Sequence, residues 1–385
     1  MRSIYFDANA TTSLDPAVRA VMLPFLAEIS GNPSSIHQMG RAARAHLDAA
    51  RERVADSWGC QPGEVIFTSG GTESNNLAIL GTARFLRSRG RHIITSVIEH
   101  HAVLHCCEHL ERQEGFQVTY LPVNGEGLIA PETLASAIRP DTILVSLMAA
   151  NNEIGTIQPV AELGRICENR GVVFHTDAVQ WFGKEPFTGI RQFHAPLVST
   201  CAHKYYGPKG VGALFVQSPL RLEPILFGGP QENERRAGTE NLAANVGFAE
   251  ATARFVRTPV FQRAQLQTLA ERLLAIGAQP PVPGIIALGS RQHRLVNTIA
   301  FAVHGCDTLT LLAALDLEGI CAAGGSACSA GSVQPSHVLR ALGLPLPAKN
   351  TALLRFSLGR DATMAEVEHV AGLLPEIIRR VQDRQ

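Results

Sequence analysis

The sequence predicts an α/β protein whose main sheet is mostly parallel and covered by helices on both faces, followed by a smaller α+β domain. Extended and helical runs alternate up to about residue 251, and the expected strands are continuously apolar, as is typical of strands buried on both faces. Beyond Ala251 the composition changes to polar helical and proline-rich sequence. A chain of 385 residues is long enough for two domains with separate cores.

The expected elements follow from apolar spacing and from turn residues. A helix is predicted at 41–56, and a short strand at 65–68 leads into a glycine pair. Further buried strands are expected at 92–95, 142–147, 172–175 and 212–216. In the second part we expect a helix at 261–276, a stiff proline-rich segment at 279–284, and strands at 296–301 and 353–357.

Charge and hydropathy exclude several classes of function. The chain has 34 basic residues (Lys and Arg) and 34 acidic residues (Asp and Glu). It therefore has no excess of positive charge that would indicate nucleic-acid binding. No apolar run approaches the ~18 residues that cross a bilayer. The chain also begins in strand-like sequence without an apolar signal segment. We therefore expect a cytoplasmic protein that binds neither membrane nor nucleic acid.

The eight cysteines show neither C-x-x-C pairs nor zinc-ligand spacing, so most are expected to be small buried residues in a reducing compartment. Two of them fall beside four histidines in and just before a predicted helix at 102–110. One helix rarely supplies a closed tetrahedral ligand set, so no metal site is expected there. This group consists of His100, His101, His105, Cys106, Cys107 and His109.

Asp177 and Lys204 each follow a short apolar run, so both side chains are expected at one edge of the sheet. A lysine that can form a Schiff base, together with an acid that keeps a pyridinium nitrogen protonated, is what pyridoxal phosphate chemistry requires. For either residue alone, a surface lysine or a helix-capping aspartate is the more ordinary interpretation. The loops that surround the pair favour the catalytic one.

The strand at 65–68 runs into a loop that could hold a phosphate. Gly70 and Gly71 let the backbone approach an anion, the following helix offers free N–H groups, and Thr72 adds a hydroxyl. The alternative is a tight strand-to-helix turn capped by Thr72 or Ser74, because the lysine of a P-loop is missing.

Four further side chains complete the predicted site. His100 and Asn152 follow expected strands, where an imidazole could lie against a ring or relay protons, with a structural hydrogen bond as the alternative. Cys328 lies among glycines, alanines and serines, which would leave its sulfur accessible. Arg355 interrupts an apolar strand, where it would grip a substrate carboxylate or, alternatively, form an internal salt bridge.

With these residues in hand, the chain resembles the cysteine desulfurases of the NifS/IscS type, within the class V aminotransferase family of fold type I pyridoxal phosphate enzymes. The resemblance runs over almost the whole length and rests on many ordered motifs. They are DANATT at 7–12, GNPSS at 31–35, TSGGTESNN at 68–76, EH at 99–100, NNEIG at 151–155, HTDAVQ at 175–180, HK at 203–204, RRAGTEN at 235–241, GSAC at 325–328 and LRFSLGR at 354–360.

The resemblance implies an aspartate aminotransferase-like large domain with a seven-stranded sheet at 14–258. A small domain, formed by 1–13 and 259–385, would carry the cysteine loop. The implied reaction converts L-cysteine to L-alanine and leaves a persulfide on Cys328. A homodimer and a sulfur-acceptor protein are implied as well, with an iron–sulfur scaffold among the candidate acceptors.

The resemblance also implies a role for each site residue. Lys204 would hold the coenzyme and move protons, Asp177 would pair with the ring nitrogen, Gln180 with the ring hydroxyl, and His100 would stack on the ring and take part in catalysis. Contacts with the cofactor, mostly with its phosphate, are implied for Gly71, Thr72, Asn152, Cys201, His203 and, from the partner subunit, Thr239. Asn32, Asn152 and Arg355 would bind the substrate carboxylate.

Cys201 departs from the family pattern, which usually has serine or threonine at this position. A thiol is a poorer hydrogen-bond donor than a hydroxyl, and losing a good hydrogen bond to a charged group costs about 1–3 kcal/mol. Two alternatives therefore stay open beside the desulfurase. One is a selenocysteine lyase or related β-eliminating enzyme, and the other is a catalytically silent sulfur-transfer partner.

Overall fold

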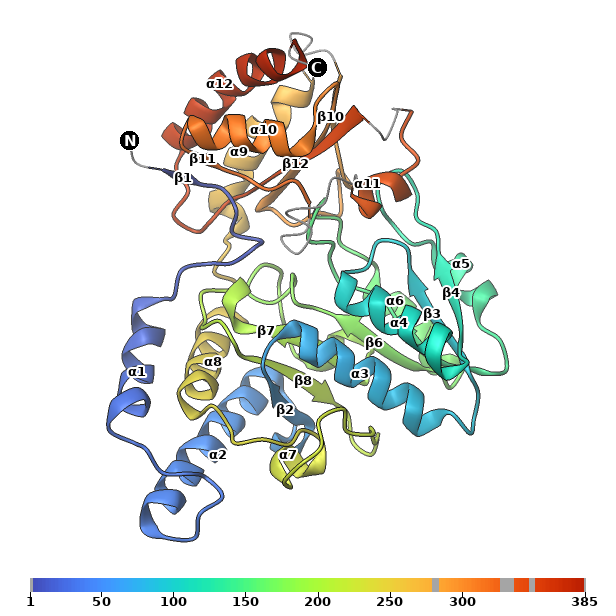
Figure 1. Cartoon of the computed structure of the whole chain (residues 1–385), viewed down its shortest axis with the longest axis vertical. Helices are drawn as coiled ribbons and strands as arrows, with labels where there is room; N and C mark the ends of the chain where they lie inside the picture. The colour runs from blue at the N-terminus through green and yellow to red at the C-terminus, as the bar shows by residue number, and fades with distance from the viewer. Residues whose placement is uncertain (1–2, 279–283, 326–335, 346–349, 384–385) are drawn as a thin grey trace.

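The computed structural model describes residues 3–278, 284–325, 336–345 and 350–383. These residues form a larger body and a smaller body, each built around a sheet. Both ends of the chain lie with the smaller body, at the top of Figure 1.

The larger sheet contains β2 (Val65–Thr68), β3 (His92–Ser96), β4 (Gln117–Leu121), β5 (Thr142–Ser146), β6 (Val173–Asp177), β7 (Leu197–Cys201) and β8 (Gly212–Val216). Their spatial order is β2-β8-β7-β6-β5-β3-β4. β8 runs antiparallel to both of its neighbours, and the other pairs are parallel. The predicted fold class, with a mostly parallel seven-stranded sheet, is confirmed.

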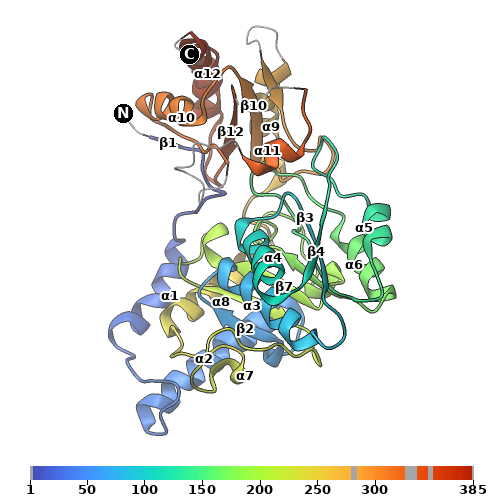
Figure 2. The same ribbon diagram turned by 45° about the vertical axis from the view of Figure 1, so that its right-hand side comes forward.

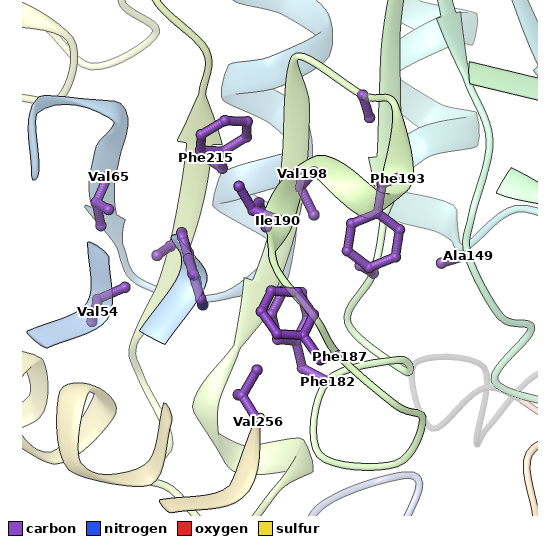
Figure 3. Packing of buried hydrophobic residues seen from close by; sticks show 14 of the residues in the cluster. Val54, Val65, Ala149, Phe182, Phe187, Ile190, Phe193, Val198, Phe215 and Val256 are labelled. Carbon is purple, nitrogen blue, oxygen red and sulfur yellow. The ribbon is translucent and has the colours of Figure 1, made fainter. Parts of the chain in front are cut away.

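Helices cover both faces of this sheet because its strands are apolar on both sides. In β5, Leu144 belongs to the apolar cluster on one face of the sheet, which also contains Ile79. The adjacent Val145 belongs to the cluster on the other face, which also contains Phe248. The first side is covered by α3 (Gly71–Leu86) and α4 (His101–Glu114). The second side is covered by α2 (Gln38–Trp58), α5 (Pro131–Ala137), α6 (Val160–Asn169) and α8 (Leu242–Phe255). Figure 3 shows the aromatic centre of this second core.

Shorter elements connect these layers. α1 (Pro16–Ala27) packs along α8 and starts at the N-cap Asp15, whose carboxylate accepts the Ala17 N–H at 2.9 Å. The remaining short helices are η1 (Pro62–Glu64), η2 (Ile190–Phe193), η3 (Ala202–Lys204) and α7 (Gln231–Glu234).

In the smaller body, β10 (Thr298–His304) pairs antiparallel with both β9 (Ile285–Ala287) and β12 (Thr351–Ser357). β1 (Ile4–Tyr5) pairs parallel with β11 (Ile320–Cys321), so the start of the chain joins this body, as both views show (Figures 1 and 2). Its helices are α9 (Arg263–Leu274), η4 (Ala275–Ala278), α10 (Thr308–Leu317), α11 (His337–Ala341) and α12 (Met364–Gln382). The division at residues 14 and 259 stays a prediction.

The expected elements agree with the observed ones except at their ends. The strands at 65–68 and 212–216 have the predicted bounds. The strand expected at 296–301 begins only at Thr298, because Asn297 is turned to donate to the Asn9 side chain and to the Leu358 carbonyl. The helix expected at 261–276 is shorter, because Gln262 is extended and Ala275 begins a 3₁₀ turn. Most of the segment at 279–284 lies outside the described residues.

Within the described ranges, no helix is both long enough and apolar enough to cross a membrane. The same ranges contain no group of three or more His, Cys, Asp or Glu side chains arranged to hold a metal ion.

Candidate active site

A cavity of about 800 Å³, including the open space at its mouth, lies at the carboxyl ends of the parallel strands. Ligands of open α/β sheets bind at this edge because the loops that follow the strands meet there. Asp177 ends β6 and Cys201 ends β7, while Lys204 follows one turn later in η3. The cavity is lined by Asn9, Ala10, Gly71, Thr72, Asn75, His100, Met148, Ala150, Asn152, Asp177, Val179, Gln180, Cys201, His203, Lys204 and Arg355.

Asp177 is buried, and both of its carboxylate oxygens accept N–H bonds. Oδ1 accepts the Val179 backbone N–H at 3.0 Å, and Oδ2 accepts from Asn75 Nδ2 at 2.7 Å. These two bonds fix the plane of the carboxylate in the cavity. Sequence reasoning did not select Asn75. The sequence could have indicated it, because Asn75 lies near the start of the helix that follows Gly70 and Gly71.

The Lys204 amine is held by the N-terminal segment. Nζ donates to the backbone carbonyls of Asn9 at 2.7 Å and Ala10 at 2.8 Å. The DANATT motif thus reaches the edge of the large sheet at which the cavity lies. Asp177 and Lys204 line the same cavity, on adjacent strand ends, as the sequence led us to expect.

The two histidines of the cavity are held neutral by their surroundings. Burial lowers the pKa of His203 to about 3, and nearby lysines add to this effect. Burial also lowers the pKa of His100. His100 Nδ1 accepts the Ala102 N–H at 3.1 Å at the start of α4, so the proton of the neutral ring lies on Nε2.

The start of α3 forms the end of the cavity where the sequence predicts an anion site. Gly70 precedes this helix with φ 152°, a conformation that favours glycine. A Cβ atom on Gly71 would lie 2.7 Å from Val179 Cγ2, so the close packing here also requires glycine. Thr72 lies on the same helix turn, and the N–H groups of this turn are unused by the helix itself.

Cys201 faces the start of α3. Its side chain is buried, and burial raises the pKa of its thiol to about 11 against the opposing effects of Lys204 and of the Gly71 N–H. The thiol is therefore neutral at physiological pH. It presents a weak donor where a hydroxyl would be a strong one.

Arg355 combines the two interpretations that the sequence left open. Its buried guanidinium forms an ion pair with Asp7, with Nη2 2.5 Å from Oδ1, and Nη1 donates to the Asn152 carbonyl at 2.9 Å. It also lines the cavity, and its Nε has no hydrogen-bond partner among the described residues. An internal salt bridge is thus present, and the same side chain also borders the cavity.

Two predicted site residues do not line this cavity, and a third lies outside the described residues. Asn32 is exposed, and its Oδ1 accepts the Ser34 N–H at 2.9 Å within its own loop. Thr239 is also exposed and does not line the cavity of its own chain. Cys328 lies outside the described residues.

Comparison with known proteins defines the class to which this site belongs. The aminotransferase class-V family matches residues 4–370. The chain therefore belongs to the aminotransferase class-V family, which uses pyridoxal phosphate. Within it, the chain groups with the cysteine desulfurases of the IscS and NifS type.

Individual relatives support this grouping over nearly the full length. Cysteine desulfurase IscS of Dictyoglomus turgidum is 43% identical over 381 residues, which cover 99% of this chain and 96% of the relative. A solved NifS-like protein has a TM-score of 0.89 at 36% identity and covers 98% of this chain and 100% of its own. The structure described as SspA in complex with cysteine has a TM-score of 0.80 at 34% identity, covering 93% and 99%.

The donor set of the cavity fits pyridoxal phosphate. It supplies a fixed carboxylate (Asp177), an amine (Lys204), N–H groups at a helix start, and a neutral imidazole (His100). Among the described residues, the buried Asn75 Oδ1 also lacks a partner inside this cavity, which indicates a polar group still to be accommodated.

Proposed function

We propose that this protein is a pyridoxal phosphate-dependent cysteine desulfurase that converts L-cysteine to L-alanine and takes the sulfur onto Cys328 as a persulfide. The observation that carries the proposal is the placement of Lys204 and Asp177 in one cavity at adjacent strand ends. Membership of the desulfurase group supports the reaction class and the substrate.

The coenzyme would be held by residues from several strand ends. Lys204 would bind it covalently, Asp177 would face the ring nitrogen, and His100 would lie on the ring. Phosphate would lie at the start of α3, against Gly71, Thr72, Cys201 and His203, with Thr239 of the partner subunit. When bound, pyridoxal phosphate supplies an electron sink for negative charge at the substrate α-carbon.

The chain's own residues then position the substrate and move protons. The Lys204 amine, once free, is the general base and acid within reach of the α-carbon. Asn152 and Arg355 would bind the substrate carboxylate, and the unused Nε of Arg355 offers a donor for it. Asn32 would add to this contact, as the motif resemblance implies. His100 would supply its Nε2 proton to the substrate carbon that keeps the electron pair when the carbon–sulfur bond breaks.

The sulfur step balances without an outside oxidant. The Cys328 thiolate forms a bond to the substrate sulfur as the carbon–sulfur bond breaks, and the electron pair of that bond stays with the carbon. Protonation of the carbon gives alanine, and Cys328 keeps the sulfur as a persulfide. An acceptor protein would then remove it; an iron–sulfur scaffold is one candidate class.

The proposal is tested by incubating the purified holoprotein with L-cysteine and a reductant and measuring alanine and sulfide together. We expect equal amounts of both. Cys328→Ser should abolish sulfide release while the visible absorption of the coenzyme stays, and Cys321→Ser, a half-buried control, should retain activity. Continued turnover by Cys328→Ser would favour a lyase instead. A protein that stays colourless with added coenzyme would favour the silent partner.

The proposal includes a homodimer, because Thr239 could contribute to a site only across an interface. Large apolar side chains exposed on one chain support it, notably Leu26 in α1 and Phe227, which is 85% exposed. Sedimentation should give twice the mass of one chain. A monomer that is fully active would contradict this part of the proposal.

A further inference from the structure

Lys184 is a buried lysine beneath the cavity to which neither the sequence motifs nor the proposed mechanism assigns a role. Its side chain is only 3% exposed, and it follows Gln180 by four residues in the turns after β6. Its stem and amine lie near the Phe261 ring, with Nζ 5.3 Å from the ring centroid. Burying an amine is costly unless its N–H groups are used, so its hydrogen bonds indicate what it does.

The Lys184 amine donates to two side-chain amides. Nζ donates to Asn9 Oδ1 at 2.6 Å and also to Gln180 Oε1. Because each of these oxygens accepts from an amine, the NH₂ group of each amide must point the other way. Gln180 Nε2 accordingly donates to the Asn9 backbone carbonyl at 3.1 Å.

This arrangement leaves Gln180 with one orientation. A flipped amide would set its oxygen against the Asn9 carbonyl oxygen, which is repulsive, and would lose the bond that its oxygen accepts from the Lys184 amine. An amide nitrogen carries two N–H groups, and the bond to Asn9 uses one of them. Gln180 lines the cavity, so it can present to a ligand only an N–H donor.

The same amine orders the segment that holds Lys204. Asn9 Oδ1 accepts from Lys184 and, at 3.1 Å, from Asn297 Nδ2, which turns Asn9 Nδ2 toward Thr298 Oγ1 at 2.9 Å. The backbone carbonyl of Asn9 is one of the two acceptors of the Lys204 amine. Lys184 therefore acts on both sides of the coenzyme position through hydrogen bonds.

We propose that Lys184 is a positioning residue that locks the Gln180 amide with its N–H toward the cavity, so that this side chain donates to the ring oxygen of bound pyridoxal phosphate. The inference rests on the proposed function. A donor at this oxygen stabilises its negative charge, which weakens the hold of the oxygen on the proton at the Lys204 linkage. The charged groups that act on Lys184 are Lys204, Arg355 and Glu185, and the neutral Cys201 thiol also lies nearby.

The test is a pH titration of the visible absorption band of the holoprotein. Lys184→Met keeps the apolar stem and removes the donor, so the Gln180 amide is free to flip. We expect the titration midpoint to rise by about one pH unit, a tenfold change in proton affinity, as for the loss of one hydrogen bond to a charged group. Lys209→Met, at an exposed lysine, is the matched control and should leave the midpoint unchanged.

A double variant separates positioning from a direct effect of charge. Gln180→Leu alone should raise the midpoint, and adding Lys184→Met should raise it by much less than Lys184→Met does in the wild type, because the lysine acts mainly through the glutamine. Additive shifts, or no shift in Lys184→Met, would overturn the proposal. If Lys184→Met does not fold, Lys184→Gln still offers an N–H donor to the Gln180 oxygen and should leave the midpoint near the wild-type value, and a shift as large as that of Gln180→Leu would overturn the proposal.

The coenzyme affinity of the apoprotein gives a second readout, since a misoriented Gln180 should weaken binding several-fold in Lys184→Met. The outcomes are also separable from those of the proposed function. A wild-type protein that forms alanine while Lys184→Met titrates normally would overturn the role of Lys184 alone. A wild-type protein that never binds the coenzyme would overturn both.

Discussion

Replacing Cys201 by serine should tighten coenzyme binding. The thiol ends β7 in the cavity, with 1% of the residue exposed, and burial raises its pKa to about 11. It therefore stays a neutral, weak donor beside the helix start where the phosphate would bind. A serine hydroxyl at the same Cβ can donate a full hydrogen bond to a phosphate oxygen.

The size of the effect follows from the burial and charge of this position. A hydrogen bond to a charged group contributes about 1.5–3 kcal/mol. At a buried site, competing hydrogen bonds to water offset little of this contribution. Oxygen is smaller than sulfur, so a small packing loss offsets part of the gain. A net gain of about 1.4 kcal/mol corresponds to a tenfold lower dissociation constant.

The assay is equilibrium titration of the apoprotein with pyridoxal phosphate, followed by absorbance. Cys201→Ser should bind about ten times more tightly than the wild type, whereas Cys60→Ser should bind like the wild type, because Cys60 does not line the cavity. Unchanged or weaker binding by Cys201→Ser would show that the phosphate does not contact this side chain.

Two further changes probe buried charges. Asp7→Asn removes the charge partner of the buried Arg355 and should lower the free energy of unfolding in guanidinium chloride by about 2–4 kcal/mol. Glu368→Gln, in an exposed ion pair, should leave the free energy of unfolding unchanged. If Asp7→Asn and Glu368→Gln lowered it by the same amount, burial of the Arg355 ion pair would not explain the loss. Burial raises the pKa of Glu99 from 4.5 to about 8, so between these values Glu99 is protonated in the folded state and ionised in the unfolded state, and the free energy of unfolding falls as pH rises. Glu99→Gln should therefore gain stability relative to wild type between pH 5 and pH 8; a pH-independent difference would contradict this.

The parts of the fold that the sequence could predict are those with a local signal. Continuous apolar runs located the strands, and parallel strands bring their ends to one edge, which placed Asp177 beside Lys204. An apolar run carries no direction, so the reversal of β8 could not be predicted. The pairing of β1 with β11 is equally non-local, since it joins residues 4–5 to residues 320–321.

The candidate site likewise depends partly on contacts that the sequence could not predict. Asp7 and Arg355 lie in separate motifs, and only the folded chain brings them into an ion pair. Lys184 was missed because a lysine in a turn is ordinarily exposed. Its available signal was the apolar run of Trp181, Phe182 and Gly183 directly before it, one turn beyond Gln180.

The linkage of the coenzyme to Lys204 is the claim on which the proposed chemistry depends. The sequence contains four lysines, at 184, 204, 209 and 349, and of these only Lys204 lines the cavity among the described residues. Borohydride reduction of the holoprotein, followed by peptide mass spectrometry, would locate the coenzyme directly. We expect the phosphopyridoxyl group on Lys204. Its recovery on Lys184, on another lysine or on no residue would contradict the account.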